Sequence, residues 1–155
     1  MTPEAIVLAI LSLFPYMSGN NRQCIERDQA RIVQQLRESQ VPIEPNAPTP
    51  PLELLAAVAF METHLGCDAH EGGNWGAPID RNHRHTAGTH MSAVRVLVHG
   101  YQRCGTWEGS VLRFRTGLCN PARQSSSDVI RRIGPRYLRR VQSLVTRIRS
   151  HRSGA

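Results

Sequence analysis

Apolar residues recur with the helical spacing of three to four along most of the chain, and no stretch shows a convincing strand pattern. The spacing predicts helices over residues 3–14, 22–40, 50–65, 89–103 and 107–116, then a short turn at 129–133 and a last helix that restarts at Gly134-Pro135. Threonines stand where N-caps are expected, at Thr2, Thr49 and Thr106, and Gly117 is placed to end a helix. We therefore expect an all-α fold.

Two segments interrupt the helical pattern. Residues 41–51 carry five prolines, which remove backbone donors and predict an extended connector. Residues 66–88 are rich in Gly, Asn, Asp and His and predict a long loop, with room for a minor β-hairpin. A chain of 155 residues suits one domain, so we expect residues 1–49 to pack on a core formed by residues 50–150.

The helix predicted over 50–65 is apolar on nearly all sides, which is typical of a buried helix, and it ends in Glu62. Leu55, Val58 and Ala59 share the helix face of Glu62. A carboxyl group that borders an apolar surface favours its neutral form, as a general acid requires. The alternative is that Glu62 simply ends the helix with its carboxylate in water.

The run Leu54-Leu55-Ala56-Ala57-Val58-Ala59-Phe60-Met61-Glu62-Thr63 resembles the catalytic helix of lytic transglycosylases and goose-type lysozymes, where an apolar run ends in Glu and a hydroxyl residue. The segment 72–79 occupies the place of that family's Gly-rich groove segment, 112–117 that of its Tyr-Asn-x-Gly motif, and 137–141 that of its late Tyr helix. The chain departs from the family in having Gly-Ala-Pro-Ile for Gly-Leu-Met-Gln, and Phe114-Arg115 for Tyr-Asn.

The resemblance implies a lysozyme-like helical domain that cuts the β-1,4 bond between MurNAc and GlcNAc in peptidoglycan glycan strands. Glu62 would protonate the leaving oxygen and then take a proton from the muramic 6-hydroxyl, closing a 1,6-anhydro ring without a second carboxylate or any cofactor. Alternatively, Asp68 or Asp80 positions a water and the enzyme is an inverting hydrolase. The expected substrate-binding residues are Thr63, Asn74, Trp75, Gly76, Phe114 and Tyr137.

Each of two aromatic residues in that set has a structural alternative. Trp75 suits a sugar platform, because an aromatic face packs on a pyranose ring, but it equally suits a ring that covers loop and core. Tyr137 could hydrogen-bond near Glu62, or it could be a core residue on the stripe of Val141 and Leu144.

All 19 basic residues are arginines and the net charge is +7, which favours anionic polymers as partners. Eight of these arginines fall between 131 and 152, so a non-enzymatic basic protein, either a structural virion component or a nonspecific nucleic-acid-binding module, is the main rival interpretation. A weaker rival is a metal site built from Cys67, His70, His83, His85 and His90, but their spacing matches no standard zinc module and we expect no metal.

The apolar run 6–14 lacks a preceding basic residue, so we interpret it as a core helix rather than a signal peptide, and it is too short to span a membrane. This favours a phage virion protein, with other virion proteins as possible partners, or a protein released to the periplasm or cell wall. The four cysteines, at 24, 67, 104 and 119, allow either reduced thiols or two disulfides in any of three pairings.

Overall fold

The computed structural model describes residues 1–68, 75–76 and 89–151, and within these ranges the chain forms helices and no strand. The all-α prediction is therefore confirmed, while the hairpin expected between 66 and 88 falls almost wholly outside the described residues. The helices are α1 (Pro3–Leu13), α2 (Gly19–Arg27), α3 (Gln29–Glu38), α4 (Leu52–Thr63), α5 (His90–Cys104), α6 (Trp107–Thr116), α7 (Pro121–Gln124) and α8 (Asp128–His151).

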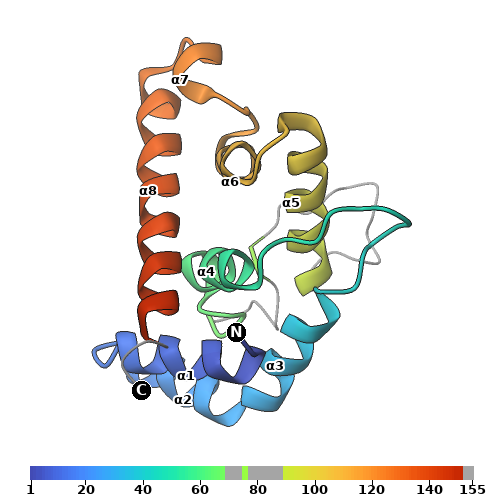
Figure 1. The fold of residues 1–155 in the computed structure, drawn as a ribbon. Helices are drawn as coiled ribbons and strands as arrows, with labels where there is room; N and C mark the ends of the chain where they lie inside the picture. The colour runs from blue at the N-terminus through green and yellow to red at the C-terminus, as the bar shows by residue number, and fades with distance from the viewer. Residues whose placement is uncertain (69–74, 77–88, 152–155) are drawn as a thin grey trace.

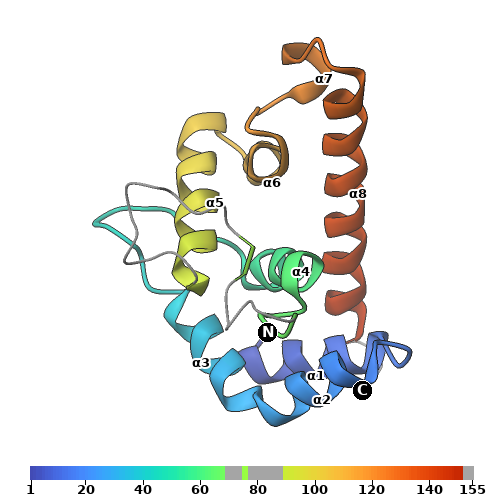
Figure 2. The ribbon, with the colours of Figure 1, turned by 180° about the vertical axis from the view of Figure 1, so that it is seen from behind.

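Helix α4 lies in the middle of the molecule, and the other helices surround it (Figures 1 and 2). The long helix α8 runs along one side and α5 along the other, with α6 between them. Helices α1 to α3 cross the base, where the N-terminus and the last turn of α8 lie. The end of α4 is thus held between the base and α8.

The central helix is buried over seven consecutive residues, Leu54 to Phe60, as its apolar sequence predicts. The same hydrophobic core includes Ile6 and Ile10 of α1 and Val141 of α8. Residues before 49 therefore share one core with the rest of the chain. A helix without a polar face cannot be stable in water by itself, so α4 depends on these neighbours for its existence.

Two helix boundaries differ from the sequence prediction. The helix expected over 22–40 breaks at Asp28, whose backbone (φ −100°, ψ 20°) leaves the helical region and whose N–H donates to the Cys24 carbonyl. Helix α4 begins at Leu52 rather than behind a Thr49 cap, with Pro51 in the N-cap position and no side-chain cap. The cause is the pair Pro50-Pro51, because a residue that precedes proline is kept extended.

The prediction that the last helix restarts at Gly134-Pro135 is wrong, because α8 runs unbroken from Asp128 to His151 with Pro135 inside it. Its buried residues follow one continuous stripe, from Gly134 through Tyr137 and Val141 to Ile148. Burial of that stripe outweighs the cost of an internal proline, about 3 kcal/mol. No helix in the described ranges combines the length and apolar character needed to cross a lipid bilayer.

Helices α5 and α6 approach closely at Gly100, where a Cβ would lie 2.6 Å from Ser110 Oγ and 3.1 Å from Ser110 Cα. The Ser110 hydroxyl cannot move away easily, because it is buried and donates to the Leu97 carbonyl at 2.6 Å. Gly100→Ala should therefore lower the free energy of unfolding by about 1–3 kcal/mol, although alanine is ordinarily the better helix former.

Gly19→Ala is the matched control, because Gly19 is also helical and nothing lies within 4 Å of its added Cβ. Urea unfolding of both variants measures the difference. Equal stability of the two variants would mean that α5 and α6 do not pack at this distance.

Candidate active site

Glu62 lies in the last turn of α4 and is half-buried. The residues that share its helix face, Leu55, Val58 and Ala59, are fully buried. The carboxylate therefore extends from the end of an apolar helix, which is the placement that the sequence predicts.

Gly76 packs directly on the Glu62 side chain. A Cβ built on Gly76 would lie 2.5 Å from Glu62 Cβ and 3.1 Å from Glu62 Oε2, so only glycine allows this approach. Its φ of +85° also favours glycine. The structure thus brings together two residues, Glu62 and Gly76, that the sequence analysis placed in one site from separate motifs.

Tyr137 of α8 is the third predicted residue at this place. Burial raises the pKa of its phenol well above the usual value, and the Glu62 carboxylate raises that pKa further. The hydroxyl is buried, and although Glu62 is within interaction range, it has no hydrogen bond of regular geometry within the described residues. The Tyr137 hydroxyl and the Glu62 carboxylate are therefore close enough to interact, but no regular hydrogen bond fixes their relative position.

Two arginines that the sequence analysis did not select complete this cluster. The guanidinium of Arg115, from α6, lies 5.6 Å from the centre of the Tyr137 ring. The charges of Arg115 and Arg140 both act to lower the pKa of Tyr137, against the larger effects of burial and Glu62. Arg115 lies where the family that the chain resembles has Asn, and this difference is the one feature of the sequence that points to Arg115.

The chain makes an unusual turn immediately after the acid. His64, Leu65 and Gly66 all have left-handed backbone, with φ of 49°, 60° and 79°. For a residue other than glycine this conformation costs roughly 1–2 kcal/mol, so the surrounding contacts must impose it. Leu65 is fully buried, which is one such contact.

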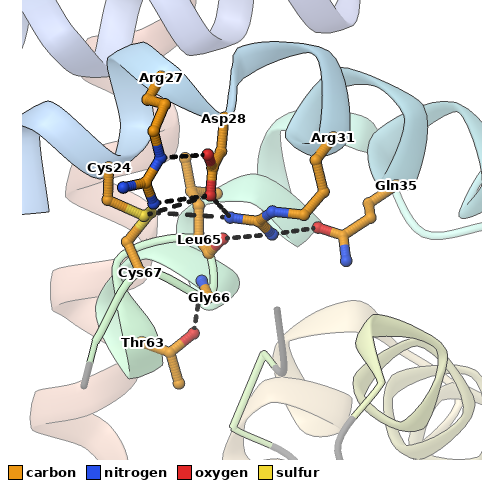
Figure 3. A network of polar contacts seen from close by, with 9 residues as sticks. All are labelled: Cys24, Arg27, Asp28, Arg31, Gln35, Thr63, Leu65, Gly66 and Cys67. Atoms are coloured by element: carbon orange, nitrogen blue, oxygen red, sulfur yellow. Dashed lines mark hydrogen bonds and ion pairs between the residues drawn. A yellow bond between two sulfur atoms is a disulfide. The ribbon is translucent and has the colours of Figure 1, made fainter. Parts of the chain in front are cut away.

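A polar network fixes this turn to α2 and α3 (Figure 3). Arg31 donates to the Leu65 carbonyl at 3.4 Å and to Gln35 at 2.8 Å, and it lies 3.5 Å from Asp28. The pKa of Asp28 is lowered mainly by the hydrogen bond from Arg27, whose guanidinium is nearer to Asp28 than that of Arg31. The network therefore ties the chain that follows Glu62 to the base of the molecule.

The cysteines form two disulfides, Cys24–Cys67 and Cys104–Cys119. The first joins α2 to the turn after Glu62 and spans 43 residues, and the second links the end of α5 to the segment after α6 across 15 residues. The sequence left open reduced thiols or any of three disulfide pairings, and the structure has this one. Cys67 is consequently not a thiolate, so the metal interpretation loses its sulfur ligand, while His70, His83 and His85 lie outside the described residues.

Asp68, the nearer candidate for a second carboxylate, is engaged in the same turn. Its Oδ1 lies 2.6 Å from His64 Nδ1 and accepts a hydrogen bond from Asn21 at 3.1 Å. These contacts give Asp68 a structural role. Asp80, the other candidate, lies outside the described residues.

The remaining predicted binding residues that the structure describes have structural contacts of their own. Thr63 is buried in the turn, where its hydroxyl donates to the Ala59 carbonyl and accepts from the Gly66 N–H at 2.9 Å. Trp75 is fully buried with its ring against His90, so it has no free face for a sugar and the structural alternative is the one supported. Phe114 is half-buried against the core, and Asn74 lies outside the described residues.

Comparison of the chain with known proteins assigns it to no family. The chain matches no family model, no curated protein and no solved structure. The fold and the cluster therefore define only a class, an all-α protein in which a half-buried glutamate, a glycine and a tyrosine from three separate segments meet.

Gly76→Ala should disturb the site in two ways, by its φ of +85° and by overlap with the Glu62 side chain. Gly117→Ala separates these effects, because Gly117 has a φ of +79° and nothing within 4 Å of its added Cβ. We expect the free energy of unfolding to fall by about 1 kcal/mol in Gly117→Ala and by about 3 kcal/mol in Gly76→Ala. Similar losses in urea unfolding would contradict the Gly76–Glu62 contact.

Removal of the first disulfide should release the turn after Glu62. The double variant Cys24→Ala/Cys67→Ala should lose about 4 kcal/mol of stability by loop entropy. It should also lose the hydrogen-exchange protection of the Leu65 amide, which donates to the Ala59 carbonyl at 3.1 Å.

Cys104→Ala/Cys119→Ala is the control, with an expected loss of about 3 kcal/mol and with Leu65 protection retained. Loss of Leu65 protection in both double variants would mean that the disulfide acts only on global stability.

Proposed function

We propose that this protein cleaves peptidoglycan glycan strands with Glu62 as the catalytic acid, in the manner of a lytic transglycosylase. The observation that carries the proposal is the meeting of Glu62, Gly76 and Tyr137, which come from three segments selected on sequence resemblance alone. Their proximity supports the resemblance, because the three residues lie far apart in the sequence.

Within the described residues, the contacts of Asp68 also favour a mechanism with one carboxylate. The Asp68 carboxylate is bound by His64 and Asn21, so it is not available as a base that activates water. In the proposed reaction Glu62 protonates the glycosidic oxygen as the C1–O bond breaks. It then accepts the proton of the muramic 6-hydroxyl as that oxygen bonds to C1, so the product is a 1,6-anhydro sugar and no water is consumed.

Tyr137 has a positioning role in this proposal. Its hydroxyl is buried and within interaction range of the Glu62 carboxylate. A phenol in that position can orient the carboxyl group without giving up its own proton, since its pKa is raised.

The two disulfides support a place of action outside a reducing cytosol, because disulfides persist in oxidising compartments. A periplasmic, cell-wall or virion-borne protein meets that condition, and all three locations give access to peptidoglycan.

Glu62→Gln should abolish clearing of purified peptidoglycan, with a fall in rate of at least about 100-fold, because general acid catalysis contributes that much. Glu53→Gln is the matched control: Glu53 is the other glutamate of α4, it is also half-buried, and the variant should keep full activity. Mass spectrometry of the released fragments should find anhydro ends.

Equal clearing by the wild type and Glu62→Gln would remove Glu62 from catalysis. Reducing ends in place of anhydro ends would keep Glu62 but replace the transglycosylase by a hydrolase. Failure of the wild type to clear peptidoglycan of any source would favour the second candidate, a basic protein that binds anionic polymers through the arginines of α8.

A further inference from the structure

A hollow of about 560 Å³ lies between α8 and the chain at the end of α1. Four arginines contribute to its wall, together with Phe14 and Met61: Arg136, Arg139, Arg140 and Arg147. The four arginines are exposed, and their combined positive charge attracts an anion into the hollow between them. The arrangement therefore selects for negatively charged ligands.

The acidic residues of the described chain do not neutralise these arginines. Glu4, Asp28 and Glu38, on α1 and α3 or their ends, pair with Arg37, Arg27, Arg31 and His90. Glu26 pairs with Arg22, and Asp68 with His64. Within the described residues, none of the four arginines of the hollow forms an ion pair with a carboxylate.

One of the four guanidinium groups is already positioned. Arg147 donates to the Leu13 carbonyl at 3.3 Å and stacks over the Phe14 ring at 5.2 Å. Phe14 in turn packs on Phe60 of α4, with ring centres 4.6 Å apart. A guanidinium held in this way loses less conformational entropy when it binds a ligand.

The hollow reaches the end of α4, the helix that carries Glu62 in its last turn. Met61, in its wall, precedes Glu62 in the chain, and Arg140, also in its wall, acts electrostatically on Tyr137. A second hollow of about 400 Å³ shares Phe14, Met61 and Arg140 with the first and extends to His64. A polymer bound at Glu62 could therefore place a side branch in this hollow.

We propose that the arginine hollow is a subsite for the carboxylates of the peptide stems that branch from the glycan strand. This inference rests on the proposed function, because it assigns the hollow to the same substrate. Guanidinium groups bind carboxylates through paired hydrogen bonds, and several arginines in one wall allow for the variable position of a flexible peptide.

The test measures equilibrium binding to uncleaved ligand and is independent of catalysis. The probe is a GlcNAc–MurNAc-tetrapeptide fragment, compared with the same fragment after its peptide carboxylates are converted to carboxamides. The double variant Arg136→Gln/Arg139→Gln should bind the acidic fragment about tenfold more weakly and the amidated fragment unchanged. Both residues are exposed, so the variant should fold.

Arg103→Gln/Arg123→Gln is the matched control, because it removes the same charge from exposed positions on α5 and α7. It should bind both fragments as the wild type does. An equal loss in both double variants, or an equal loss for both fragments, overturns the proposal in favour of nonspecific charge attraction. Tight binding of poly(glycerol phosphate) that depends on Arg136 and Arg139, with no preference between the two fragments, overturns it in favour of a phosphate source.

This experiment separates the subsite from the proposed function. Selective binding of the acidic fragment with no peptidoglycan clearing would retain the subsite and reject the catalytic proposal. Clearing that depends on Glu62, without selective binding, would do the reverse.

Discussion

The burial of α4 on every side is the constraint on which the rest of this structure depends. From Leu54 to Phe60 the helix offers water no polar face, so other helices must enclose it, and α1, α5, α6 and α8 contribute to one core around it. A helix buried in this way can meet water only at its ends. The N-terminal end of α4 follows Pro50 and Pro51, which keep the preceding chain extended, and the C-terminal end carries Glu62. The half-buried position of that carboxylate thus follows from the apolar character of the eight residues before it.

After Glu62 the chain turns sharply out of the core, and the next residues adopt a strained backbone to do so. His64 and Leu65 accept left-handed backbone so that Leu65 can be buried while the chain turns away. Arg31 and the Cys24–Cys67 disulfide hold that turn to the base of the molecule. Local strain of this kind persists only where several contacts over-determine it. Here the contacts come from α2 and α3, so the N-terminal helices stabilise the end of the central one.

The sequence predicted those features that depend on local pattern. The bounds of α1, α5 and α6, the burial of α4 and the absence of strands in the described residues all follow from periodicity and capping. It failed where tertiary contacts prevail over local signals: Pro135 lies inside α8 because Gly134, just before it, packs against Pro121, and the stripe of Tyr137 and Val141, just after it, is buried. The sequence left open whether Trp75 is a sugar platform or a buried ring, because a loop residue carries no periodic signal of burial, and the structure has it fully buried. The sequence marks Arg115 only as a departure from the resemblance, because its contribution to the site depends on how α6 packs beside α8.

The distribution of charge gives the candidate site its electrostatic character. Acidic residues are paired mainly along α1, α2 and α3, whereas the arginines that face the hollow beside Glu62 have no carboxylate partner in the described chain. Under the proposed mechanism Glu62 begins neutral and becomes negative as it gives its proton to the leaving oxygen. Arg115 and Arg140, whose charges act on the neighbouring Tyr137, would under this proposal stabilise the carboxylate that forms as the proton leaves Glu62. Interactions that strengthen only toward the transition state are the ones that accelerate a chemical step, so the same positive surface that would hold the acidic branches of the substrate would also assist the acid beside it.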